Sequence, residues 1–520
     1  MRIICHKLDR RAFLLGSAAL GAATMMRPRL GRAADTKILR ARSYSDLQVL
    51  DPLDRKSNPE DDITSCLLPK LISWKAGDKW EWELDAAQSI EQVDPKTIKF
   101  TLKPGILWTG SHGEVTTDDV KYSYERIADP KRQSPYADDW SSLDQVEIVD
   151  KYSGIIHLKE YYAPLWTTTL PEGSGKIVCK AAVEALPDKH FTTEIPATAG
   201  PYTFKSWEPK QRTILARDPN WKLSTPYFDE VHIHPIEDEK AAEVAFAAGE
   251  LDFTQVSLSS LANYKKSPPA GAKLVVKPSL AYVWLGMNHD HPKLKDPKVR
   301  KAIQMAVDAD GAVDAAYFGQ AERATGIIAP GMPGHRDKNL VAHDVEGAKK
   351  LLQEAGVSDL TLKLSVLNKT EHMSIAQVIQ ASLADAGVKV EIEPLDSGTF
   401  WVLGDQKSGD AWKDVQLLVQ RFSMNPDPAW ATMWFTPEQV GVWNWERWNN
   451  ADFGKMHQDE LHEADVAKRD AAYKKMQDMM EEEGNYVFLT HEATAAIYRD
   501  TIVPALQPDG DEIYDQFKGA

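Results

Sequence analysis

The residues best suited to chemistry are two His-x-His pairs. His232 and His234 fall on a predicted strand over Val231–Ile236, where alternate side chains share one face and could hold a metal ion. No third ligand is evident from the sequence, so we interpret the pair as part of a solvated strand face. His289 and His291 lie beside a proline in a predicted loop, and we interpret them in the same way.

Signatures of catalysis are otherwise nearly absent. Residues 173–176 read Gly-Ser-Gly-Lys, the ending of a phosphate-binding loop, but Leu170 stands where that loop has its first glycine. An ordinary turn is the simpler interpretation. The spacings Gly-x-Ser-x-Gly, His-Glu-x-x-His and Cys-x-x-Cys do not occur. We therefore expect no catalytic residues, no cofactor and no metal site, and a protein that is not an enzyme.

Tryptophan is unusually frequent, with 16 in the chain and a concentration between residues 430 and 448. Tryptophan favours sites where flat ligand surfaces stack and the indole N–H finds a partner. We interpret Trp434 and Trp448 as core residues. For the neighbouring group, both a core role and a role in a ligand pocket stay open, and we carry it forward as a candidate site: Trp443, Asn444, Trp445 and Arg447.

The elements that would position these residues are strands and helices in alternation. Residues 360–366 alternate polar and apolar, residues 375–383 have helical spacing that ends at Gly387, and residues 388–392 alternate again. Strand, helix and strand of these lengths predict a βαβ unit whose outer strands are parallel. The predicted fold class is α/β.

Other elements have recognisable ends. Residues 97–102 alternate as a strand and end in a Lys-Pro-Gly turn. Helices are predicted to begin at Thr117, at Asp296 followed by proline, and at Asp344. The first of these helices carries an apolar stripe of Val120, Tyr124 and Ile127.

Residues 1–33 have the composition of a secretory signal peptide. A charged start precedes an apolar stretch over 12–26 that is too short to span a bilayer, and small residues at 31 and 33 suit cleavage near Ala33. The pair Arg10-Arg11 resembles the twin-arginine export signal, with an ordinary Sec signal as the alternative. No cysteine follows as a lipid anchor and no later apolar run could cross a membrane, so we expect a soluble periplasmic protein.

Removal of this segment leaves 54 basic and 76 acidic residues and a net charge of −22. Such acidity argues against nucleic acid and anionic membranes as partners. We interpret it as a source of solubility rather than as a sign of a cationic ligand. Cys66 and Cys179 remain, and an oxidising compartment permits a bridge that sequence separation cannot decide. About 487 residues are too many for one core, so two or three domains are expected.

Motifs along most of the mature chain follow the order typical of one family. They resemble family 5 of the extracellular solute-binding proteins, the dipeptide, oligopeptide and nickel binders of ABC importers. The motifs are Pro95–Gly105, Trp108, Thr117–Arg126, Gly200–Tyr202, Ser206–Pro209, Arg217–Trp221, Phe228–Glu230, Ala248–Asp252, Asp296–Arg300, Val307-Asp308, Pro330–Gly334 and Asp344–Gly356.

The resemblance implies a two-lobed periplasmic-binding-protein fold of the large cluster, with two hinge crossings. It also implies a monomer that closes over a small solute and delivers it to membrane permease and ATPase subunits. The expected first lobe covers residues 34–283 with an inserted subdomain at about 76–195, the second lobe covers 284–488, and residues 489–520 return to the first. The expected crossings are Leu285–Asn288 and Val487–Leu489.

The resemblance places ligand contacts near the pair Asp427-Pro428. In peptide-binding relatives an Asp shortly before this pair meets the ligand's α-amine, whereas Met424 stands here, and a thioether cannot pair with an ammonium. Arg421 offers donors suited to a carboxylate or phosphate. The other ligand-binding residues expected from the resemblance are Trp284, Asn288, Trp401, Phe422 and Asn425.

Two ligand classes therefore stay open. A peptide or peptide-like compound is the main hypothesis, and an acidic compound such as an opine, a sugar phosphate or a modified peptide is the alternative. Outside solute capture, the alternatives are an exported hydrolase or metal-dependent enzyme and a periplasmic holdase. The enzyme hypothesis is disfavoured because no nucleophile, base and orienting group can be assembled from motifs.

Overall fold

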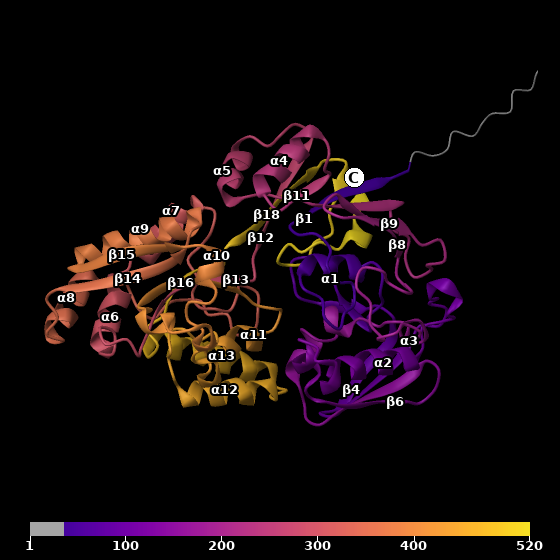
Figure 1. Ribbon diagram of the computed structural model, residues 1–520, viewed down its shortest axis with the longest axis horizontal. Coiled ribbons are helices and arrows are strands. Elements are labelled where there is room, and N and C mark those ends of the chain that lie inside the picture. The colour runs from indigo at the N-terminus through magenta and orange to yellow at the C-terminus, as the bar shows by residue number, and fades with distance from the viewer. Residues whose placement is uncertain (1–35) are drawn as a thin grey trace, which may run out of the picture. The chain divides into compact units, whose positions relative to one another are not determined.

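The computed structural model describes residues 36–520, so the expected signal peptide lies outside the described residues. Two mixed sheets organise this part of the chain, one of seven strands and one of five, and both are flanked by helices (Figure 1). The α/β class expected from the sequence is confirmed. We call the seven-stranded sheet with its attached segments the first lobe, and the five-stranded sheet with its helices the second lobe.

The first sheet is built around β1 (Ile38–Ser43), which is parallel to β10 and β11 and carries the buried Leu39 and Ala41. The C-terminal strand β18 pairs with both β11 and β12, which returns the end of the chain to the first lobe. The other strands are β8 (Tyr202–Glu208), β9 (Arg212–Arg217), β10 (Glu230–Pro235), β11 (Phe253–Gln255), β12 (Ala272–Pro278) and β18 (Ala493–Arg499). Helices α4 (Glu239–Ala248) and α5 (Leu258–Lys266) belong to this lobe.

The second sheet contains the βαβ unit expected from the sequence. Strands β14 (Leu360–Leu367) and β15 (Val388–Leu395) are parallel and are joined by α9 (Thr370–Asp385), which confirms that prediction. All seven residues of β13 (Ala281–Met287) are buried, as is usual for a strand covered on both faces. The remaining elements are β16 (Leu417–Ser423), β17 (Val487–Thr490), α6 (Pro297–Ala306), α7 (Ala309–Tyr317), α8 (Val345–Glu354), α10 (Ser397–Phe400), α11 (Pro428–Thr432), α12 (Ala451–Leu461) and α13 (Val466–Glu482).

Helices cover both faces of this second sheet. Helices α6, α7, α8 and α9 share one hydrophobic core with the same face of β14, and within it α7 packs on α9 and α6 packs on α8. Helices α11, α12 and α13 share a second core with Tyr282 and Trp284, which point to the other face. Asp296 and Asp344 cap α6 and α8 as expected, through bonds to the backbone N–H groups of Lys298 and Gly347.

The chain passes between the two sheets twice. Strand β12 ends at Pro278 and β13 begins at Ala281, so the first crossing is Ser279-Leu280. The second crossing is His491-Glu492, between β17 and β18. The expected crossings lie elsewhere: Leu285–Met287 and Val487–Leu489 are strand residues of the second sheet, and Asn288 directly follows β13. Their apolar side chains are buried in that sheet, which explains the difference.

A four-stranded antiparallel sheet lies within the segment expected to form a subdomain. It has the order β4-β5-β7-β6, and the predicted strand at 97–102 is its β5. Helix α2 (Thr117–Ala128) packs on it with the predicted apolar stripe buried. The N-cap is Thr116 rather than Thr117, because Thr116 and Asp119 form a capping box. The other elements are α1 (Asn58–Ser65), β2 (Ile72–Trp74), β3 (Trp82–Leu84), β4 (Ala87–Asp94), β6 (Leu143–Ile148), β7 (Ser153–Leu158), α3 (Lys180–Glu184), β19 (Ile502–Val503) and β20 (Lys518–Gly519).

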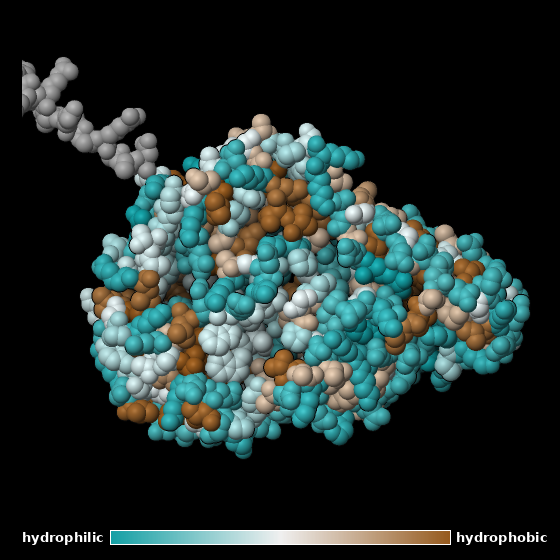
Figure 2. All heavy atoms as spheres, turned by 180° about the vertical axis from the view of Figure 1, so that it is seen from behind, coloured by the Kyte–Doolittle hydropathy of each residue, from teal (hydrophilic) through white to brown (hydrophobic). Residues whose placement is uncertain are grey.

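Cys66 and Cys179 are free buried thiols in the core of the first lobe, so the permitted bridge does not form. Burial raises the pKa of both thiols. The face shown in Figure 2 is mainly hydrophilic, with separate hydrophobic groups. None of the helices over residues 36–520 combines the length and apolarity that a bilayer crossing needs.

Candidate functional site

A cavity of about 640 Å³ lies between the two lobes. Its first-lobe wall includes α1, the hairpin β2–β3 and the C-terminal segment 507–516, and its second-lobe wall includes residues 423–426. Residues 279–281, at the first crossing, also line it. The volume falls in the range of small-molecule binding sites. Rotation of the lobes about the crossings would move the two walls relative to each other.

The first-lobe wall is strongly acidic. Ten carboxylate residues and four basic residues line the cavity. Among residues 36–520, only Asp61 of these ten carboxylates forms an ion pair, although several basic side chains lie in the same wall. Five of the other nine come from α1 and the C-terminal segment. We call these five the carboxylate wall: Asp62, Asp509, Asp511, Glu512 and Asp515.

Burial makes the carboxylate wall reluctant to ionise. It raises the pKa of Asp509 to about 6 and those of Glu512 and Asp515 to about 7, and neighbouring carboxylates add to the effect. The pKa values of Asp62 and Asp511 are raised well above their ordinary range for the same reasons. A dense group of carboxyl groups, none of them ion-paired within residues 36–520 and all of them with raised pKa values, therefore faces the cavity.

Most of the basic groups in the lining already have partners. Arg55 Nε lies 2.9 Å from Asp61 Oδ2, and the guanidinium rests over the ring of Tyr136. Lys70 donates to the carbonyl of Pro171 at 2.6 Å, and Lys103 donates to the carbonyl of Asp85. These cations brace the first-lobe wall and form no ion pair with the carboxylate wall. Lys56, the fourth basic residue of the lining, is exposed and forms no ion pair with it either.

Aromatic side chains supply the less polar part of the lining. Trp74 and Trp80 pack edge to face with their ring centroids 5.2 Å apart, and the Trp74 indole donates to Glu172 at 2.6 Å. Trp221 and Trp430 also line the cavity, from the first and second lobes respectively. Their flat surfaces suit organic ligands.

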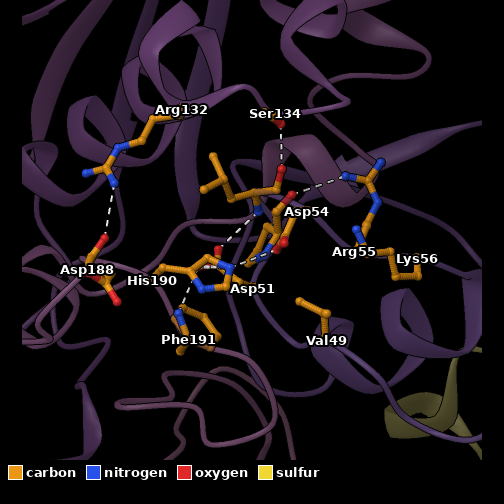
Figure 3. A network of polar contacts seen from close by, with 12 residues as sticks. Val49, Asp51, Asp54, Arg55, Lys56, Arg132, Ser134, Asp188, His190 and Phe191 are labelled. Carbon is orange, nitrogen blue, oxygen red and sulfur yellow. Dashed lines mark hydrogen bonds and ion pairs between the residues drawn. The ribbon is translucent and has the colours of Figure 1, made fainter.

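A buried aspartate fixes the segment that leads into α1. Asp51 is fully buried and accepts two bonds from Arg126, at 2.8 and 2.5 Å. Phe191 donates its backbone N–H to the same carboxylate, and His190 lies 3.0 Å from Asp54 Oδ1 (Figure 3). Because Asp62 lies on the helix that follows, this network helps to position one end of the carboxylate wall.

Of the residues expected to bind ligand, Met424 and Asn425 line the cavity. Arg421 is not in the lining: its Nε lies 2.7 Å from Glu492 Oε2, at the second crossing. The argument for an acidic ligand depended on a free Arg421, and this pairing together with the acidic lining removes its basis. Met424 faces the cavity with only 3% of its surface exposed.

Five other expected residues are held inside the second lobe and are absent from the lining. Trp284 donates to Glu446 at 2.8 Å, and Asn288 donates to the carbonyl of Val415. Asn444 donates to three carbonyls of its own loop region, which accounts for its complete burial. Trp445 donates to the carbonyl of Val442, and Arg447 pairs with Asp290. These side chains stabilise the lobe.

Trp401, Phe422 and Trp443 form a half-buried aromatic group outside the cavity lining. Phe422 is in its middle, with centroids 6.4 Å from Trp401 and 5.9 Å from Trp443. The sequence therefore located an aromatic cluster, but the cavity takes its aromatic surface from other tryptophans.

The carboxylate wall was missed at the sequence level. The segment Pro508–Asp515 contains four carboxylates and a tyrosine near the end of the chain, and this density was the available signal. Its meaning depends on β18 carrying the C-terminus back beside α1. Local pattern alone cannot supply that proximity.

The motifs considered for metal and phosphate have structural partners. His232 lies 2.8 Å from Glu230, and His289 lies 3.0 Å from the carbonyl of Gly484. No group of three His, Cys, Asp or Glu side chains in the described residues is arranged to hold a metal ion. Lys176 is buried and donates to Asp61 and Thr64, so residues 173–176 do not form a phosphate loop.

Comparison with known proteins gives consistent matches. The model of the bacterial extracellular solute-binding proteins, family 5 Middle, matches residues 81–441. The oligopeptide-binding protein AppA of Bacillus subtilis is 24% identical over 453 residues, covering 82% of each chain. The probable D,D-dipeptide-binding periplasmic protein DdpA of Escherichia coli is 24% identical over 459 residues, covering 86% of each.

Solved structures agree on the fold. The ABC transporter substrate-binding protein CtaP of Listeria monocytogenes superposes with a TM-score of 0.81 at 21% identity, over 93% of this chain and 99% of that one. AppA of Bacillus subtilis in complex with a nonapeptide has a TM-score of 0.73 at 22% identity, with the same coverage.

Proposed function

The chain belongs to family 5 of the bacterial extracellular solute-binding proteins, and from that premise we propose that its inter-lobe cavity captures a peptide or peptide-like solute for an ABC importer. The family binds solutes as a component of transporters, which implies no catalytic activity of its own. The observation that carries the proposal is the cavity of about 640 Å³, with walls from both lobes and a crossing in its lining. This arrangement lets the lobes close over a ligand.

Peptide is the favoured ligand class for two reasons. Relatives that match three quarters or more of this chain are named oligopeptide- or dipeptide-binding proteins. The cavity itself combines tryptophan faces with many polar groups, which suits a short chain of amide units better than a purely apolar compound. An acidic non-peptide ligand lacks a free basic partner at Arg421.

The working context is also part of the proposal. We expect export by the N-terminal segment, action as a monomer in the periplasm, and delivery to permease and ATPase subunits. Two relatives carry the word periplasmic in their names, which supports this location.

The test uses protein purified after export from the cells that produce it. Calorimetry with synthetic peptides of two to nine residues should give saturable binding, and small-angle scattering should show a smaller radius of gyration in the bound state. The melting temperature should rise with peptide concentration because only the native state binds. Failure of every peptide to bind, with tight binding of a sugar phosphate or opine, would overturn the peptide proposal.

A further inference from the structure

We propose that the solute carries a cationic side chain, and that the carboxylate wall holds the ammonium or guanidinium group of that side chain. This inference rests on the proposed function and deepens it by naming the charge of the ligand. It also revises the interpretation of the chain's acidity as a source of solubility alone, because a dense part of that acidity faces the cavity.

The first support is a shortage of counter-charge. The carboxylate wall comes from two segments, α1 and residues 509–515, that line the same cavity. Its members form no ion pair with any residue from 36 to 520. Arg55, Lys70 and Lys103 are engaged elsewhere, and Lys56 is exposed to solvent. Ionised groups withdrawn from water are costly unless paired. A positively charged ligand would supply the missing partner.

A second, independent observation is the side chain of Tyr514. Only 2% of its surface is exposed, it lines the cavity, and its hydroxyl forms no hydrogen bond to any described residue. The hydroxyl lies near enough to Glu512 and Asp62 for their charges to raise its pKa further than burial alone does. A phenol oxygen without a hydrogen-bond partner, on a side chain that lines the cavity among carboxylates, is suited to accept a bond from an ammonium or guanidinium N–H.

The second-lobe wall of the cavity has no charged residue, so the first lobe must bind the positive group of the ligand. Met424 and Asn425, which line the second-lobe side, are uncharged. All carboxylates of the lining therefore belong to the first lobe, and half of them lie on α1 and the C-terminal segment as the carboxylate wall. Trp74 and Trp80 lie in the same first-lobe wall and offer faces on which the aliphatic part of a lysine or arginine side chain can pack.

The arrangement favours an organic cation over a metal ion. In the part of the chain that the structure describes, no three His, Cys, Asp or Glu side chains converge at metal-binding distances. A divalent cation needs such convergence, whereas ammonium and guanidinium groups bond to separate acceptors spread along a surface.

The experiment compares tripeptides of equal length: Lys-Ala-Lys, Ala-Ala-Ala and Glu-Ala-Glu. Calorimetry on the parent protein should rank Lys-Ala-Lys first by about tenfold or more, with Glu-Ala-Glu weakest. The double variant Glu512→Gln/Asp515→Asn should lose about tenfold or more in affinity for Lys-Ala-Lys while affinity for Ala-Ala-Ala is kept. Asp385→Asn, an exposed charge change at the end of α9 in the second lobe, is the matched control and should change neither.

The outcomes separate this inference from the proposed function. Equal affinity for the lysine and alanine peptides would overturn the cationic ligand and leave peptide binding intact. Binding of no peptide at all would overturn both. A rise in melting temperature with nickel or magnesium chloride alone, lost in the double variant, would assign the carboxylate wall to a metal and overturn the inference. The double variant removes unpaired buried charges, so it should fold at least as stably as the parent.

Discussion

Arg421, on β16 of the second sheet, and Glu492, at the second crossing, are joined by an ion pair of 2.7 Å. Glu492 also accepts a bond from the Tyr317 hydroxyl at 3.1 Å and has a left-handed backbone with φ of 45°. One carboxylate thus connects the crossing to a strand and a helix of the second lobe. The residue that the sequence suggested as an anion receptor instead braces the hinge.

If Arg421 supports the hinge, replacing it should change how readily the lobes close but not which ligand charge the protein prefers. Arg421→Ala should change the unfolding free energy by about 1 kcal/mol or less, because the side chain is 38% exposed and solvent screens the pair. It should alter the affinities for lysine, alanine and glutamate tripeptides by one common factor. Calorimetry with the three peptides checks this. A selective gain or loss for the acidic peptide would return Arg421 to the binding site.

A hydrogen bond away from the crossings also joins the two lobes. The Thr167 hydroxyl donates to Asp427 at 2.7 Å, and Arg469 holds the same carboxylate at 3.0 Å. Thr167→Val should weaken ligand binding by about 1 kcal/mol, the usual contribution of one hydrogen bond, because it removes a bond between the two lobes that enclose the ligand. Scattering and calorimetry on the same samples provide the measurement. Thr168→Val, whose hydroxyl bonds within its own turn at Pro164, serves as the control.

The buried pair Asp51–Arg126 should be sensitive to removal of either partner. Its side chains are almost completely buried, so Arg126→Met leaves a buried carboxylate with backbone donors only. We expect a loss of about 3–5 kcal/mol in unfolding free energy. Denaturant titration measures it. Asp51→Asn/Arg126→Met should recover part of the loss, and a double variant as unstable as the single one would show that the charge is not the cause.

The raised pKa values of the carboxylate wall predict a pH effect on stability with a definite sign. Carboxyls with a folded pKa near 6 to 7 bind protons that the unfolded chain releases near pH 4, so their contribution to stability is lost as pH rises through that window. Glu512→Gln/Asp515→Asn should therefore be more stable than the parent at pH 8, with the difference shrinking towards pH 5. Buried histidines such as His289 and His372, whose pKa values are lowered to about 4, change the stability with pH in the opposite direction. They are present in both the parent and the double variant, so their effect cancels in the difference between the two.

The affinity for a cationic ligand should rise with pH, whereas the contribution of these carboxyls to stability falls. A cation binds the ionised wall, so the affinity for Lys-Ala-Lys should fall from pH 8 to pH 5.5, with release of protons on binding at neutral pH. Calorimetry in buffers of different ionisation enthalpy detects the protons. A pH-independent affinity would argue against contact with the wall. The charged groups that surround the wall and contribute to this titration are Arg42, Asp61, Lys70, Glu83, Asp85, Glu172, Lys176 and Lys277.

Export is testable without reference to the described residues. If Arg10-Arg11 is read by the twin-arginine machinery, Arg10→Lys/Arg11→Lys should leave folded precursor in the cytoplasm. Cell fractionation followed by immunoblotting gives the distribution. Undiminished periplasmic yield would show that the Sec route suffices.

Local patterns were sufficient for the class and for single elements. The strand–helix–strand unit at 360–395 and the caps at Asp296 and Asp344 depend on neighbours within one helix turn or strand, so periodicity and residue type predicted them. Thr117 was one residue off because the capping box pairs Thr116 with Asp119. The crossings expected from the sequence were misplaced into β13 and β17, whose residues are buried and apolar. An apolar run of this kind does not show whether it lies inside a sheet or at the boundary between two lobes.

The ligand site required tertiary structure. Asp62 and Asp515 are near opposite ends of the described chain and line the same cavity only because β18 pairs with β11 and β12 and returns the C-terminus to the first lobe. Whether a charged side chain is free also depends on contacts across the sequence, as with Arg421 and Glu492. The sequence by itself determined the family, the α/β class and the excess of acid. Only the folded chain decided which carboxylates lack a partner, because pairing and burial are set by residues far apart along the chain.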